Sequence, residues 1–209
     1  MTEISNEPDF DFEGWLSAAR RPERSVVVYG RADLLADIDQ LEADLRAVVT
    51  IPDEDRAMGD ASGSDIEKQI DALYEQMGAS KMVIRVRALI DNETELIRDK
   101  AEAEPDVKAL MNSAASKARA DAREHCKRAE VKAVNDINAF VRNAATAASS
   151  QVLTRETDLR ILAEAIVSPK MSVAGVRAML EAIGEPQVNL VKAAFSRASN
   201  EAPKVALPK

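Results

Sequence analysis

The residue types that most often do chemistry are sparse in this 209-residue chain. His125 and Cys126 are adjacent, which on a helix directs their side chains about 100° apart, so they cannot readily act together as base and nucleophile. Asp53, Glu54 and Asp55 offer carboxylates to a divalent cation, but the glycine and terminal glutamate of an EF-hand loop are missing. The sequence contains no glycine-rich phosphate loop and no nucleophile elbow. We therefore expect no catalytic residue, no cofactor and no metal site, and predict that the protein is not an enzyme.

Large apolar residues cluster near the N-terminus in an otherwise polar stretch, at Phe10, Phe12, Trp15 and Leu16. A short helix is expected to start near Asp11 and to end before Pro22. Residues 1–24 are therefore predicted to form an arm that docks on the core. The alternative is that the four apolar residues bind a partner, which makes them the candidate partner-binding site.

The negative charge is concentrated in one segment. The net charge is −8, and residues 31–80 contain thirteen Asp or Glu against four Lys or Arg, or −9. The remainder is nearly neutral, so we expect neither a nucleic-acid nor a membrane partner. The helices expected around Gly184 have the size of a helix-turn-helix, but too few basic residues flank it for phosphate contacts. The apolar runs are too short to span a membrane and the acidic start does not resemble a signal peptide, so a cytoplasmic location is predicted.

Two β-branched runs, Ser25–Tyr29 and Lys81–Arg87, predict short strands. Between them, two apolar series repeat with the spacing of a coiled-coil seam: Leu34, Ile38, Leu41, Leu45 and Val48, then Ile66, Ile70, Leu73 and Met77. The second series should begin with a capping box at Ser64 and end at a left-handed Gly78. The linker between the series is long enough to reverse the chain, which predicts an antiparallel helical hairpin with the two strands paired antiparallel at its base, in a domain of residues 25–98.

The rest of the chain is predicted to be helical, which makes the fold class mostly α (α+β). Residues 101–150 contain fifteen alanines, so a long Ala-rich helix is expected over 99–150. Residues 151–200 predict a small C-terminal helical domain of three short helices, the first two capped by Thr154 and Ser172 and the third starting at Pro186. Residues 201–209 are expected to be disordered.

The order of these features resembles the tail assembly chaperones of long-tailed bacteriophages that infect actinobacteria. Four segments carry the resemblance: residues 10–12 (Phe-Asp-Phe), 21–28, 31–45 and 83–89. These segments lie within residues 1–95, and beyond them the chain is similar to the family only in its helical character.

The resemblance implies a function without chemistry. Such a protein coats the tape measure protein and keeps it soluble until the tail tube polymerises, is absent from the mature virion, and works in the host cytoplasm. The tape measure protein is the implied partner, with the tail tube protein as a further one. The alternative is a structural coiled-coil component of a phage particle, in which the two seams form permanent contacts in a homo-oligomer.

Overall fold

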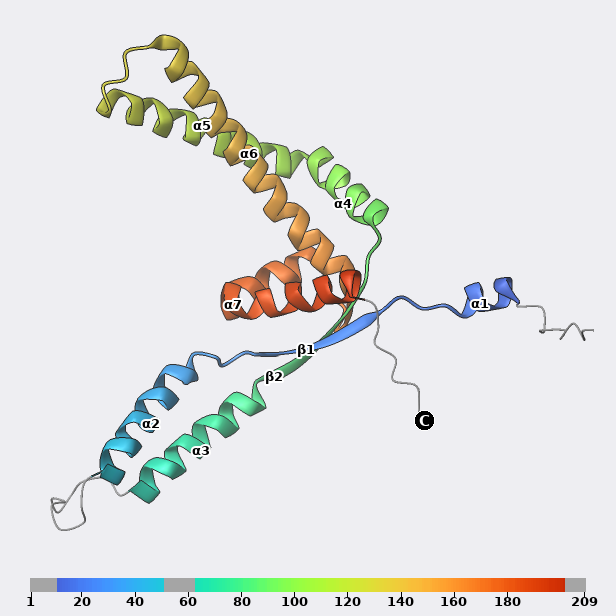
Figure 1. Ribbon diagram of the computed structural model, residues 1–209, viewed down its shortest axis with the longest axis vertical. Coiled ribbons are helices and arrows are strands. Elements are labelled where there is room, and N and C mark those ends of the chain that lie inside the picture. The colour runs from blue at the N-terminus through green and yellow to red at the C-terminus, as the bar shows by residue number, and fades with distance from the viewer. Residues whose placement is uncertain (1–10, 51–62, 202–209) are drawn as a thin grey trace, which may run out of the picture.

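The computed structural model describes residues 11–50 and 63–201 of the chain. Within these ranges it confirms a mostly α fold with one small sheet. The elements follow one another as α1 (Phe12–Ala18), β1 (Glu23–Tyr29), α2 (Leu34–Thr50), α3 (Gly63–Ala79), β2 (Lys81–Arg87), α4 (Asp91–Ala103), α5 (Pro105–Arg128), α6 (Val134–Ala165), β3 (Ile166–Ser168) and α7 (Val173–Asn200). Two helical hairpins and α1 project in different directions from a centre formed by the sheet and α7 (Figure 1).

The sheet contains three antiparallel strands in the order β1-β2-β3. The two predicted strands are present and paired as expected, with Val26 opposite Ile84, although β1 begins two residues earlier than predicted. Alternation along β2 buries Ile84 and Val86 and exposes Val83. The third strand was not predicted, because its three residues are too few to show alternation.

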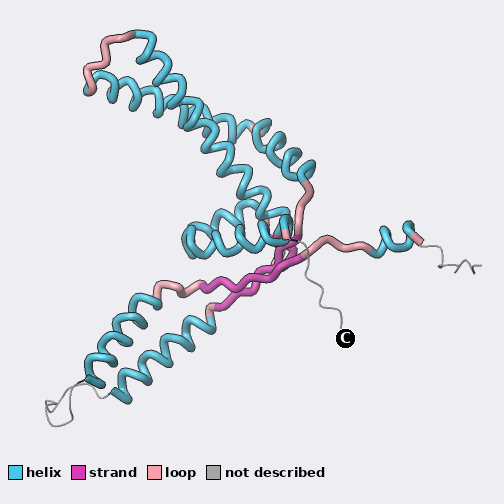
Figure 2. Tube along the Cα trace, in the orientation of Figure 1, coloured by secondary structure: helices cyan, strands magenta, loops and turns pink. Residues whose placement is uncertain are grey.

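The main core lies between one face of the sheet and the helices α6 and α7 (Figure 2). Its buried members come from all of these elements: Val28, Ile84, Val86, Leu159, Leu162, Ala163, Ile166, Val176, Met179, Val188, Val191 and Ala194. Burial of this apolar surface is what holds the short strands in place, since a two-stranded ribbon is marginal alone.

The predicted helical hairpin is confirmed as α2 and α3. α2 follows the end of β1, and α3 precedes the start of β2. The backbone N–H of Gly30 donates to the carbonyl of Ser80 (3.1 Å) and closes the base of the hairpin. The predicted boundaries of α3 were wrong. Ser64 lies inside the helix, which begins at Gly63, and Gly78 does not have a positive φ and is part of the helix.

The Ala-rich segment is not one helix. α4 ends before Pro105, and α5 and α6 pack side by side as a second antiparallel hairpin. The turn after α5 is a Schellman motif: Val131 N–H donates to the Cys126 carbonyl (3.0 Å), Glu130 N–H donates to the Lys127 carbonyl (3.2 Å), and Glu130 has φ 51°. Glutamate occupies the left-handed position that glycine usually takes, so the sequence carried no signal for this turn.

Of the three short helices expected in the last third, the first is instead the end of the long helix α6, whereas the other two are present as the two parts of α7, which meet at Gly184. Residue 150, the expected domain boundary, and Thr154 both lie inside α6, so Thr154 does not cap a helix. The cap at Ser172 is confirmed, because its hydroxyl accepts from Gly175 N–H (3.1 Å). The expected break before Pro186 is present as a kink inside α7, where Gly184 has φ 74° and ψ 168°.

Candidate partner-binding site

The helix α1 forms the arm predicted from the sequence. The Asp11 carboxylate accepts a hydrogen bond from Gly14 N–H (2.9 Å) and caps the start of the helix, as expected. At the other end, Arg20 donates to the carbonyls of Ser17 (3.1 Å) and Ala19 (2.9 Å), which satisfies acceptors left free at the helix terminus. Local interactions of this kind define α1 without any help from the core.

Three of the four candidate residues lie on this helix, and Phe10 lies outside the described residues. The side chains of Phe12, Trp15 and Leu16 are 57%, 55% and 56% exposed. The Phe12 and Trp15 rings stack with centroids 6.0 Å apart. The spacing of three and four residues places the three side chains together along one side of the helix, so they form an apolar stripe.

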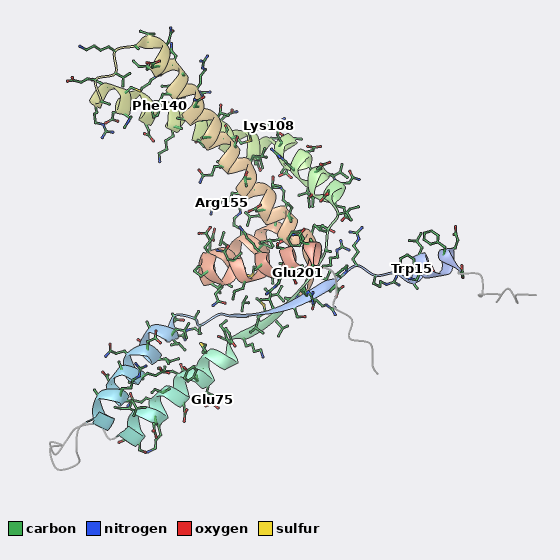
Figure 3. The ribbon with its side chains drawn as sticks, viewed as in Figure 1. Trp15, Glu75, Lys108, Phe140, Arg155 and Glu201 are labelled. Atoms are coloured by element: carbon green, nitrogen blue, oxygen red, sulfur yellow. The ribbon has the colours of Figure 1, made fainter. Side chains whose placement is uncertain are left out.

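The expectation that the arm docks on the core was wrong. No residue of α1 is buried, and Trp15 lies on a helix that extends away from the sheet and α7 (Figure 3). The helices α6 and α7, and not α1, cover the inner face of the sheet.

The base of the arm is fixed to the body by polar contacts. The Arg21 guanidinium pairs with the Glu93 carboxylate at the start of α4, and the Pro22 carbonyl accepts from Ala88 N–H (2.9 Å). The Ile90 N–H and the Arg21 guanidinium both hold the pKa of Glu93 below its ordinary value. The arm therefore has an anchored origin and an exposed apolar end.

The side chains of His125 and Cys126 lie in different surroundings. Cys126 is buried, whereas the His125 ring stacks on Phe140 with centroids 5.5 Å apart. The acidic run at 53–55 lies outside the described residues. In residues 11–50 and 63–201, no three His, Cys, Asp or Glu side chains converge as a metal ion would require.

A groove of about 670 Å³ lies between α6 and α7. Its apolar part includes Leu159, Leu162 and Val188, and its polar part includes the ion pair of Asp158 and Lys192 (3.2 Å). No histidine or cysteine is among the residues that line it. The groove thus combines apolar surface with an ion pair.

A buried ion network was not predicted from the sequence. The Glu156 carboxylate is 5% exposed and binds Arg160 of the same helix (2.7 Å) and Arg177 of α7 (2.9 Å). Arg160 also pairs with Glu104, which precedes α5. Burial acts to raise the pKa of Glu156, but the two guanidinium groups outweigh it and the pKa is lowered. The spacing of Glu156 and Arg160 was the one signal in the sequence, since it brings both to the same side of a helix.

Comparisons of this chain with models of known protein families, with curated proteins and with solved structures find no match. Within the described residues, no helix combines the length and apolarity needed to cross a membrane.

Proposed function

We propose that this protein is a tail assembly chaperone that binds the tape measure protein of a long-tailed bacteriophage and keeps it soluble while the tail is built. The observation that carries the proposal is the exposed stripe of Phe12, Trp15 and Leu16 on an anchored, projecting helix. Aromatic and aliphatic side chains of this kind are the anchors with which proteins bind apolar helical partners. The resemblance of residues 1–95 to that family supplies the identity of the partner.

The proposed chaperone acts by contact alone. A long apolar helical protein aggregates through its exposed side chains, and a bound arm would cover them. Its site of action is the host cytoplasm, and it leaves before the virion matures. The tail tube protein is a further proposed partner.

The test is co-expression with the tape measure protein of the same phage. The wild-type chain should increase the soluble fraction of that protein, and the double variant Phe12→Ser, Leu16→Ser should lose most of the increase. A matched control is Leu96→Ser, Leu110→Ser, because these leucines are each 49% exposed but lie on α4 and α5. Equal solubility with and without the wild-type chain would refute the proposal.

A structural virion component is the second candidate, favoured by the coiled-coil spacing of the α2 and α3 seam. Mass spectrometry of purified particles separates the two candidates. A structural component is retained in stoichiometric amounts, whereas a chaperone is missing from the particles.

A further inference from the structure

In the α2/α3 hairpin, the apolar side chains of the seam between the two helices are only partly buried. α2 and α3 pack mainly against each other, and neither makes more than slight contact with any other described element. Leu34, Ile38, Ile66 and Ile70 are buried in the seam. The remaining seam residues stay partly exposed: Leu41, Leu45, Val48, Leu73 and Met77. Two helices alone cannot bury a full apolar face, so this hairpin has room for a third.

One flank of the hairpin carries additional apolar side chains. Leu35 and Glu42 are one heptad apart on α2 and follow the seam residues Leu34 and Leu41, so they share a flank. The Tyr74 hydroxyl donates to the Glu42 carboxylate (3.2 Å), which places Tyr74 of α3 on the same flank. Leu35 is 43% exposed and Tyr74 is 44% exposed.

A groove of about 310 Å³ lies along this hairpin. Leu45 and Ile70 contribute its apolar part, and Glu42, Glu67 and Asp71 contribute carboxylates. Arg46 also lines the groove and pairs with Glu42 (3.3 Å). The groove therefore combines an apolar floor with a net negative rim.

The charge of the hairpin determines which partner fits this groove. α2 and α3 together contain eight Asp or Glu and two Lys or Arg, a net charge of −6. A second copy of the hairpin would bring two such surfaces together, and like charges repel. A helix with basic residues on both sides of an apolar stripe complements both the floor and the rim.

We propose that the flank formed by Leu35, Glu42, Glu67 and Tyr74 binds a basic amphipathic helix as the third helix of a bundle. Apolar residues of the partner pack over Leu45 and Ile70, and its Lys or Arg side chains pair with the rim carboxylates. The site lies on a different element from the arm, and binding here does not depend on the proposed function of the arm.

The test measures the affinity of the full-length protein for a synthetic peptide. The peptide has about three heptads with leucine at the seam positions and lysine beside them. Fluorescence anisotropy at about 0.15 M salt gives the dissociation constant. The groove variant Glu42→Lys, Glu67→Lys should weaken binding about tenfold, because two attractions become repulsions.

The matched control is Asp37→Lys, Asp44→Lys, which changes the net charge by the same amount on the opposite flank of α2. It should weaken binding less than about threefold, since these exposed charges act only through screened long-range attraction. Equal losses in both variants would overturn the proposal, because binding would then depend on net charge alone.

A second variant removes apolar surface without changing charge. Leu35→Ser, Tyr74→Ser should also weaken peptide binding about tenfold, the loss expected for two partly buried apolar contacts. Circular dichroism establishes that each variant keeps the wild-type helical content. Unchanged affinity of this variant, or self-association of the wild-type chain that blocks the peptide, would refute a heterologous helix as the occupant.

Discussion

The Glu156 carboxylate is almost fully buried but remains charged because two arginines bind it. Together with Glu104, these residues connect the start of α5, the last third of α6 and the first turns of α7. The network thereby joins the α5/α6 hairpin to α7. A buried carboxylate is costly unless it is paired, so each member depends on the others.

Replacement of Glu156 by Gln should lower the free energy of unfolding by about 2 kcal/mol, because two charge-assisted hydrogen bonds weaken. Urea unfolding followed by circular dichroism measures the change. The matched control is Glu164→Gln, whose partner Arg87 is 36% exposed. That substitution should cost less than about 1 kcal/mol, as exposed ion pairs do. Equal costs would contradict the structural role of the network.

The same carboxylate predicts a pH dependence. The folded pKa of Glu156 is lowered, so its stabilisation is complete above the unfolded pKa of about 4.3 and is lost as the pH falls through the folded pKa. The difference in unfolding free energy between wild type and Glu156→Gln should therefore shrink as the pH falls from about 5 through the folded pKa. Urea unfolding across this range checks it, and a difference that stays constant would argue against an ionised Glu156.

At the scale of elements, the kink in α7 depends on one glycine. Gly184 has φ 74° and ψ 168°, a conformation that is essentially restricted to glycine. An added Cβ would meet Pro186 Cδ at 3.6 Å, which is ordinary contact. The requirement for glycine is therefore a matter of backbone conformation and not of space.

Gly184→Ala should destabilise the protein by about 1–3 kcal/mol, the usual cost of forcing a side chain into this region. Gly78→Ala is the control, because Gly78 is in a helix and a Cβ there meets nothing within 4 Å. It should instead stabilise by about 0.5–1 kcal/mol. Thermal unfolding of the two variants should therefore shift in opposite directions, and shifts of the same sign would contradict this account.

The elements that were predicted from sequence are those with strong local patterns. The β-branched runs of β1 and β2 and the heptads of α2 and α3 were recognisable because alternation and spacing are local. The turn at Glu130 was missed because it lacks glycine, and β3 was missed because it is short. The apolar residues of the arm were identified, but their exposure was not, since docking depends on whether the assembled core leaves room.

At the scale of the whole molecule, the α2/α3 hairpin is separate from the main core. The two clusters share no residue, and the hairpin joins the sheet at Gly30 and Ser80. The Gly30 N–H donates to the Ser80 carbonyl directly beyond the Tyr29–Lys81 pair, so the two strand ends are close enough for a two-residue turn to join them. A short turn is therefore enough to connect β1 to β2, and the α2/α3 hairpin is inserted in place of that turn.

Replacement of residues 31–79 by Asn-Gly should leave the remaining protein folded. Thermal unfolding should remain cooperative, with a midpoint within about 4 °C of wild type, because the main core loses no member. The helical circular dichroism signal should fall only by the contribution of α2 and α3. A gradual, non-cooperative transition would show that the hairpin supports the core.

The strand β1 joins the arm at one end to the hairpin at the other, and so acts as a rigid spacer. Its seven residues extend roughly 23 Å at the rise of a β-strand. A helix that touches both ends must therefore be at least about 15 residues long. If the proposed arm and hairpin sites bind one partner, a segment shorter than this engages one site at a time, whereas a longer one gains avidity from both.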